Sequence, residues 1–350
     1  ECSLMKGWTA GAGRRAPVAA AILFFFGFSA YAQPSKPDTS RPTKIGVFLN
    51  AVFDIDPGRD SYVADLYVWS LSPAKGPDPL AQVSFPRAKF LTILEKWSEI
   101  DGDIFWSVRR FRCEMNEEWD VTDYPFDVHV INILIGSYAG AAILPRMEVD
   151  NAHSGANTAS SSIGWHLSDF HLNVGTVSYA TNFGDPSLTA DQPKPWVVAS
   201  FELSRHSWPL FLKLVTGAYV AFAASMLACL MKTDQPPIFA GRVGLQIACL
   251  FSIILNHRFT SSSMGKEDIF GLLDTLHLTS YVLLFAAIFV TLRSRVLNER
   301  TDGKGAIRFE RSATLGLVTI FVLVNLFVIS RAILTPPHED EVTKIFLRER

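Results

Sequence analysis

Residues 209–231 read PLFLKLVTGAYVAFAASMLACLM, and this stretch decides the class of the protein. Its 23 residues hold a single charge, Lys213, near the start. A helix that crosses a bilayer needs about 20 mostly apolar residues. The stretch therefore predicts a membrane-spanning helix.

Three more apolar stretches follow it, at residues 243–255, 276–292 and 315–329. We therefore predict a transmembrane domain of four helices over residues 208–335, with a C-terminal tail at 336–350. A multi-pass protein of the cell membrane, surrounded by lipid, is the expected class.

The links between these helices differ in positive charge. Residues 293–313 hold six Lys and Arg residues, and residues 231–242 hold Lys232 and Arg242. The link after the second helix holds only Lys266. Because positively charged links stay on the cytoplasmic side, the links at residues 231–242 and 293–313 should be cytoplasmic. The N-terminal part should then be extracellular or periplasmic.

Composition supports this class. The chain has 350 residues, 49% of them hydrophobic and 19% charged, and its mean hydropathy is +0.20. The net charge of −2 gives no basis for nucleic-acid binding. Four cysteines are too few for a disulfide framework in a chain of this size.

The N-terminus has the pattern of a signal peptide. Basic residues precede the apolar run 16–28, and Ala30-Tyr31-Ala32 fits the small-x-small cleavage pattern. We predict a signal peptide over residues 1–32 and a Pro-rich linker over 33–42. An uncleaved anchor helix is the alternative.

Residues 43–207 have the composition and pattern of β-strands. β-Branched and aromatic runs are separated by turn residues, for example Asp56-Pro57-Gly58. Many short strands at this spacing predict an antiparallel β-sandwich. The expected strands lie at residues 45–49, 62–69, 105–115, 126–135, 165–174 and 196–204.

The second apolar helix runs into Asn256-His257-Arg258, three residues that are costly against lipid. One helical stripe joins Gly244, Ala248, Phe251, Leu255, Arg258 (or Phe259) and Ser262. Large apolar residues in its middle are typical of a pore that gates by dewetting. The alternative is a helix buried among its neighbours, with Arg258 reaching to the interface.

Several motifs occur in a defined order. Tyr124-Pro125-Phe126-Asp127 precedes Gly164-Trp165-His166-Leu167, and Ser204-Arg205 stands before the first helix, which Pro209 opens. With Phe53-Asp54-Ile55-Asp56 in the first inter-strand loop, residues 43–335 resemble the pentameric ligand-gated ion channels (Cys-loop receptor superfamily), prokaryotic branch.

This resemblance implies a homopentamer whose pore is lined by the second helix. It places Arg242 at the cytoplasmic mouth of that pore. Ala240-Gly241-Arg242 resembles the pattern of anion-selective members, which gives a lean towards anions. The alternative for Arg242 is an interface anchor that faces lipid headgroups.

The resemblance also implies a ligand site between subunits, lined by aromatic residues that bind cations or apolar ligands. The agonist would be a small molecule of unknown identity or the proton. The implied residues are Tyr67, Phe90 on the preceding loop, Tyr138, Tyr179 and Phe183. The alternative is ordinary packing in the sandwich core.

Coupling between the two domains requires charges at their junction. Asp56, Asp127 and Arg205 are expected to form one cluster there, since a guanidinium offers two carboxylates a planar fork. Three separate solvated charges are the alternative.

Enzyme motifs are missing from the sequence. The eight histidines show no zinc spacing, and neither a phosphate-binding glycine loop nor a Gly-x-Ser-x-Gly elbow occurs. His166 and His171, five apart in a strand, are expected on opposite faces. We therefore expect no catalytic activity, no metal and no cofactor. The competing functions are a non-conducting receptor or adaptor and, with less support, a transporter subunit.

Overall fold

The computed structural model describes residues 42–136, 147–160, 164–178, 180–182, 184, 186, 194–231, 234–266, 268–300 and 304–339. The described residues all belong to one compact unit. The predicted signal peptide, nearly all of the predicted linker and the tail beyond residue 339 lie outside them.

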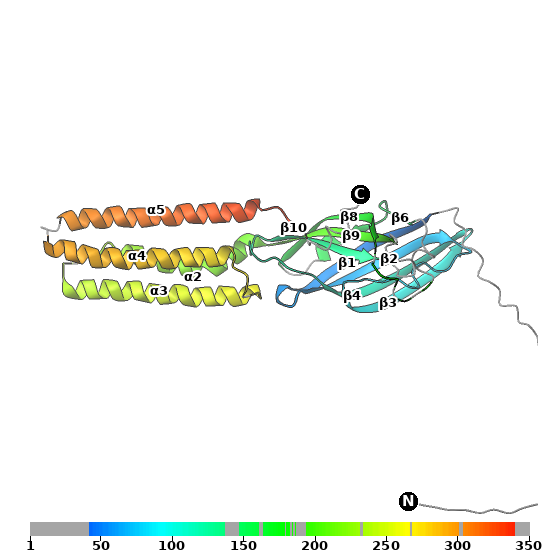
Figure 1. The fold of residues 1–350 in the computed structure, drawn as a ribbon, viewed down its shortest axis with the longest axis horizontal. Helices are drawn as coiled ribbons and strands as arrows, with labels where there is room; N and C mark the ends of the chain where they lie inside the picture. The colour runs from blue at the N-terminus through cyan, green and yellow to red at the C-terminus, as the bar shows by residue number, and fades with distance from the viewer. Residues whose placement is uncertain are drawn as a thin grey trace, which may run out of the picture. The chain divides into compact units, whose positions relative to one another are not determined.

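Among the described residues, the N-terminal region forms two sheets (Figure 1). The first has the order β3-β4-β2-β1-β6, with β7 also paired to β1, and the second has the order β10-β5-β9-β8. The first sheet comprises β1 Thr43–Asp56, β2 Ser61–Pro73, β3 Ala88–Asp101, β4 Ile104–Asn116, β6 Met147–Val149 and β7 Gly155–Ala156. The second comprises β5 Val128–Ile135, β8 Trp165–Val177, β9 Lys194–Arg205 and β10 His338–Glu339.

Alternating side chains set the register of these strands. In the β1–β2 pair, Val47 lies opposite Val68 and Leu49 opposite Leu66, and all four are buried. Inward residues of both sheets belong to one apolar core, which also contains the loop residue Trp119. Period-2 alternation therefore supplies each sheet with one buried face.

The predicted strands are confirmed, with two differences. Strand β3 was not expected, because its apolar residues at 90, 93, 94, 97 and 100 recur at a helical rather than a strand spacing. A bulge in β8 between Ser168 and His171 shifts the side-chain alternation.

This bulge corrects the prediction for the two histidines of β8. His166 pairs with Ser204 and His171 with Ser200 in β9, four residues apart. An even spacing in the partner strand places both histidines on the same face. Asp169, inside the bulge, has a φ of 51°.

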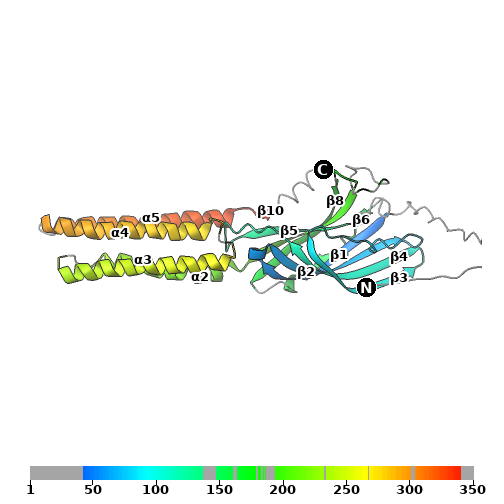
Figure 2. The same cartoon turned by 60° about the horizontal axis from the view of Figure 1, so that its bottom comes forward.

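Four helices follow the sheets: α2 Ser207–Ala228, α3 Pro236–Met264, α4 Leu272–Arg300 and α5 Lys304–Leu334. Each is long and apolar enough to cross a membrane. They run side by side in Figures 1 and 2. The four predicted helices are confirmed, and their polar ends extend beyond the apolar stretches.

The ends of α3 show why it is longer than its apolar part. Pro236 and Pro237 open the helix, where proline removes no intrahelical hydrogen bond. Gly265 closes it at a φ of 79°, the left-handed conformation that glycine adopts without strain. The intervening polar residues therefore remain helical.

A second apolar core joins the helices to one another. α2, α3 and α4 contribute most of its buried residues. α5 contacts α2 through Phe222 and Phe321, whose rings stack with centroids 4.0 Å apart, and through the Tyr219 hydroxyl, 2.5 Å from Oδ1 of Asn325.

Candidate functional site

Helix α3 has two opposite faces. Its buried residues are Arg242, Gln246, Cys249, Ile253, Thr260 and Met264. Each residue of an α-helix is turned by about 100° from the one before it, so these residues share one side. The predicted stripe lies on the other side, and its members are all exposed: Gly244, Ala248, Phe251, Leu255, Arg258 and Ser262.

Arg242 does not belong to the stripe. Its side chain is 0% exposed, and Nη1 lies 2.5 Å from Oε1 of Glu310 in α5. Nε donates to Thr291 of α4 at 3.0 Å, and Nη1 also donates to the carbonyl of Met231 at 2.9 Å. The prediction that Arg242 lines a pore mouth is therefore wrong, because the guanidinium ties α3 to α4 and α5.

The junction between the sheets and the helices holds a buried ion pair. Nε of Arg205, at the end of β9, donates to both carboxylate oxygens of Asp127 at 3.0 Å each. His129, two residues further along the chain, lies 2.8 Å from Oδ2 of the same carboxylate. The side chains of Asp127 and His129 are 3% and 2% exposed, which makes this a shielded cluster.

Aromatic rings cover the guanidinium of Arg205. Its central carbon lies 3.9 Å from the ring centroid of Trp165 and 4.8 Å from that of Tyr124. Trp165, Tyr124 and Arg205 all belong to the ordered motifs quoted in the sequence analysis. These motif residues are thus brought together, and a cation stacked on two rings is held in one orientation.

The electrostatics of Asp127 follow from these partners. Burial opposes the charge on the carboxylate, but the hydrogen bond with His129 and the charge of Arg205 outweigh it. The pKa of Asp127 consequently lies below its usual range. The pair remains charged at neutral pH.

Asp56 does not join the cluster with Asp127 and Arg205, contrary to expectation. Its Oδ1 accepts a hydrogen bond from the backbone N–H of Arg59 at 3.2 Å, and Oδ2 lies 3.4 Å from Nε of Arg59. It therefore caps the short turn Pro57–Arg59 rather than joining Arg205. His129 takes the third place. It lies two residues from Asp127, where alternate side chains of an extended chain share a face, and sequence reasoning missed this local signal.

Further contacts join the loops of the sheets to the link between α3 and α4. Lys266, in that link, lies 2.7 Å from Oδ1 of Asp60 and donates to the carbonyl of Trp119 at 2.9 Å. The backbone N–H of Leu272 donates to the carbonyl of Thr122 at 2.7 Å. Displacement of these loops would therefore pull directly on both ends of the link.

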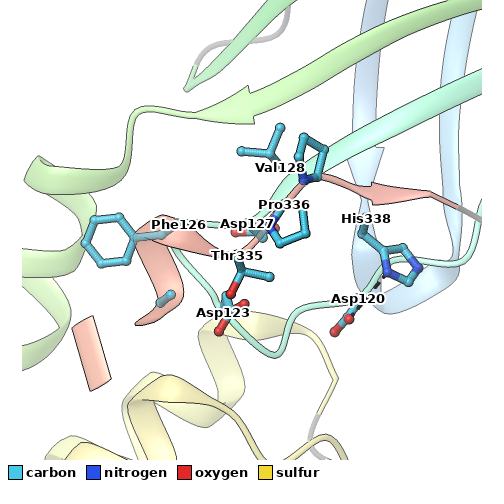
Figure 3. A pocket seen from close by; sticks show the side chains of 10 residues that line it. Asp120, Asp123, Phe126, Asp127, Val128, Thr335, Pro336 and His338 are labelled. Atoms are coloured by element: carbon cyan, nitrogen blue, oxygen red, sulfur yellow. Dashed lines mark ion pairs between the residues drawn. The ribbon is translucent and has the colours of Figure 1, made fainter. Parts of the chain in front are cut away.

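A hollow of about 260 Å³ lies beside Asp127. Figure 3 shows Asp120, Asp123 and Asp127 around it, with His338, which follows α5, beside Asp120. His338 lies 3.5 Å from Asp120. The described end of the chain thus contacts the same loop that carries the junction pair.

A second hollow, of about 480 Å³, lies on the outward face of the first sheet. Its lining is aromatic and apolar, apart from Asp150 and His153. Asp150 accepts from Trp69 at 3.1 Å and lies 2.9 Å from Nδ1 of His153. The other lining residues are Phe48, Tyr67, Leu71, Trp106 and Val108.

The charge of Asp150 gives this hollow an anionic edge. Burial opposes the charge, but the hydrogen bonds with His153 and Trp69 outweigh it and keep the pKa of Asp150 below its usual range. The guanidinium carbon of Arg110 lies 5.3 Å from the ring centroid of Tyr67, and this ring also stacks on that of Trp97. The predicted Tyr67 therefore lies in an accessible aromatic surface rather than in the core.

The other predicted ligand residues have different outcomes. Phe90 lies in strand β3, not in a loop, and is 70% exposed. Phe90 pairs with Glu114 of β4, and Tyr67 pairs with Arg110 of the same strand. These two partners are four residues apart, which is about 13 Å along a strand. Phe90 is therefore outside the hollow of Tyr67. Tyr138, Tyr179 and Phe183 lie outside the described residues.

No protein-family model matches this chain, and no curated protein matches it either. The functional argument accordingly depends on the residues and contacts given above.

Proposed function

We propose that the protein is a subunit of a homopentameric ligand-gated ion channel, of the prokaryotic branch of the Cys-loop receptor superfamily. Its two sheets would form an extracellular or periplasmic β-sandwich, and its four helices would span the cell membrane. The observation that carries the proposal is the exposed stripe of α3, in which small and polar residues stand on both sides of the large apolar Phe251 and Leu255.

The residues of the stripe favour contact with water over contact with lipid. Gly244 and Ala248 offer lipid little apolar area, and Arg258 and Ser262 would be costly against it. A lumen shared by several copies of α3 removes this cost. A head-to-tail contact that closes into a ring supplies such copies, and the resemblance sets their number at five.

The sheet edge offers a surface for that contact. Edge strand β3 exposes large apolar side chains, including Ile93, Trp97 and Ile100. An exposed apolar edge strand is a pairing and aggregation hazard unless something covers it. A neighbouring subunit that covers β3 fits both the exposure and the proposed ring.

Phe251 and Leu255 would form the gate. They are 61% and 71% exposed and lie one helical turn apart on the stripe. Rings of such side chains exclude water when the gap between them is narrow, and a small rotation of α3 would wet them. A ligand held against Tyr67 would drive that rotation through the junction of Asp127, Arg205 and Lys266.

The charge of the stripe supports a lean towards anions. α3 contains no carboxylate in its sequence. With Arg242 buried against Glu310, the stripe residue that carries a charge is Arg258. Five such arginines would attract anions to the outer end of the pore.

Two measurements test the proposal. Native mass spectrometry of the detergent-solubilised protein should show five copies, and a stable monomer or dimer would contradict it. Purified protein in planar bilayers, scanned with pH and with cationic amines, should then pass current. A pentamer that stays silent, with Phe251→Ser equally silent, would favour the non-conducting receptor or adaptor.

A further inference from the structure

Five polar side chains meet inside the helix bundle, just inward of Leu255. Asn256 and His257 come from α3, and Asp274, His277 and Tyr281 come from α4. Polar groups are costly in an apolar bundle unless all their hydrogen bonds are made. The protonation states of the titratable members therefore decide which of these hydrogen bonds between α3 and α4 can form.

His277 has its tautomer set by the backbone. Its Nδ1 lies 2.6 Å from the carbonyl oxygen of Leu273, and a carbonyl only accepts, so Nδ1 must carry a proton. Its Nε2 lies 2.9 Å from Nδ2 of Asn256, which is itself a donor. Nε2 must therefore be unprotonated for this hydrogen bond to exist.

Asn256 is fixed in the same way. Its Nδ2 also donates to the carbonyl of Leu214 in α2 at 2.7 Å. One amide nitrogen thus bridges α3 to α2 and to α4. Turning the amide over would set its oxygen against the carbonyl of Leu214, so that two acceptors would face each other.

Gly217 provides the space for this bridge. A methyl group at position 217 would overlap Oδ1 of Asn256, so the side chain sits in a notch of α2 that only glycine leaves open. Asn256 consequently cannot reorient while α2 and α3 keep their contact.

Protons can enter from His257, whose side chain is 27% exposed. Its Nε2 lies 2.8 Å from Asp274, and its Nδ1 lies 3.0 Å from the Tyr281 hydroxyl, which can either donate or accept. Its ring stacks on that of His277 with centroids 4.8 Å apart. His257 can therefore take up a second proton and keep these contacts, whereas a second proton on His277 would cost the hydrogen bond with Asn256.

The titratable groups that face this histidine pair from the described residues are Asp274 and Tyr281, both of α4. Asp274 also accepts from the backbone N–H of Gly271 at 2.8 Å, so it is held in place. The contact from α2 is the uncharged carbonyl of Leu214. One carboxylate thus faces two imidazoles.

We infer that the unprotonated Nε2 of His277 locks α3 through the Asn256 bridge, and that a proton on this Nε2 breaks the hydrogen bond between Asn256 and His277 and loosens α3. A protonated Nε2 and the Asn256 amide are both donors, so they repel each other. Asn256 and His277 are thus positioning residues that set the place of α3 according to pH.

The consequence for ion flow rests on the proposed channel, whereas the lock itself does not. Asn256 directly follows Leu255 of the proposed gate. Release of the bridge would allow the stripe to turn, so acid would change the probability of opening.

Hydrogen–deuterium exchange on the full-length protein in lipid nanodiscs tests the lock. Exchange of the α3 amides 253–264, corrected for the chemical rate, is compared at about pH 7.5 and about pH 4. The lower value lies well below the ordinary imidazole pKa of about 6.5, because burial and the hydrogen bond from Asn256 both oppose a proton on His277. We expect acid to speed exchange roughly 3- to 10-fold, the loss of one or two hydrogen bonds. His277→Gln, which cannot take up the proton, should abolish this response.

Matched variants separate the lock from general loosening. Asn325→Ala removes another buried asparagine that joins two helices, and His129→Gln removes the junction histidine; both should keep the acid response. Gly217→Ala disturbs the notch without touching a titratable group and should give fast exchange at both pH values. The lock is overturned if His277→Gln responds to acid as the wild type does, or if Gly217→Ala still needs acid to exchange rapidly.

Failure of the lock and failure of the channel give different results. An acid response that depends on His277 in a protein without conductance would keep the lock and reject the channel. Conductance in a protein whose exchange does not respond to acid would keep the channel and reject the lock.

Discussion

Helices α3 and α5 both leave most of their length uncovered, yet their exposed faces differ. Only 22% and 17% of their apolar windows are buried, against 44% for α2 and for α4. α5 exposes large apolar residues, among them Leu315, Ile320, Leu323, Leu326 and Phe327. α3 exposes Gly244, Ala248, Ser252, Arg258 and Ser262 as well as large apolar residues, among them Phe251, Leu255 and Phe259.

The comparison teaches that exposure alone does not identify the medium that a helix face meets. A large apolar face matches lipid, and a face of small residues, hydroxyls and an arginine matches water or another protein surface. The two helices have similar mean hydropathy over their best windows, 2.0 and 2.4, so hydropathy does not separate them. Three predictions test the distinction, and a fourth tests the junction outside both faces.

The largest expected effect concerns the buried side of α3. Arg242→Ala would leave Glu310 unpaired inside the bundle, which typically costs about 3–5 kcal/mol. Arg258→Ala, on the exposed side, should change the free energy of unfolding little. Denaturation in mixed micelles measures both. Arg242→Ala combined with Glu310→Ala should recover part of the loss, and no recovery would mean that the pair is not coupled.

The second prediction sets the two exposed faces directly against each other. Phe251→Ser on α3 should hydrate the gate and raise resting conductance several-fold, because a hydroxyl removes the barrier to water. Phe327→Ser, on an equally exposed position of α5, should leave conductance unchanged. Bilayer recordings at matched protein amounts compare them. Equal behaviour of the two variants would remove the distinction between the faces.

The third prediction concerns charge at the C-terminal ends of the same helices. Arg258→Glu should shift the reversal potential towards cation selectivity in asymmetric salt, because the ring of charge changes sign. Arg331→Glu, an exposed arginine near the corresponding end of α5, is the control and should shift it little. A shift from Arg331 as large as that from Arg258 would place neither residue in the pore.

The smallest expected effect lies outside both helix faces, at the junction. Since the pKa of Asp127 is lowered in the folded protein, its stabilising charge is fully present above the ordinary aspartate value of about 3.9 and is lost as pH falls below it. Acid should therefore lower the Tm of the wild type more than that of Asp127→Asn.

Two controls sharpen this junction test. Arg205→Lys should keep part of the pH dependence, since lysine supplies the charge without the planar group that stacks on Trp165 and Tyr124. Asp56→Asn should leave the pH dependence as in the wild type, because Asp56 belongs to the turn. Identical acid profiles for wild type and Asp127→Asn would mean that the pair contributes no pH-dependent stability.

Local patterns alone gave the four apolar helices, most of the strands and the composition of the α3 stripe. Each of these features depends on neighbours a few residues apart, such as the long apolar run after Trp208 or the 100° step between stripe residues. The position of Arg205 just before the first helix was equally readable from the sequence, whereas its meeting with Asp127 was expected only from the resemblance.

Only the tertiary structure decided which side chains pair. Arg242 meets Glu310, 68 residues away in the chain, and this contact removes it from the stripe. Asn256 meets Leu214 and His277 through a notch at Gly217, and the β8 bulge moves His171 to the face of His166. The physical reason is common to these cases: a buried polar group takes the partner that packing brings within about 3 Å, and that distance is not written in the local sequence.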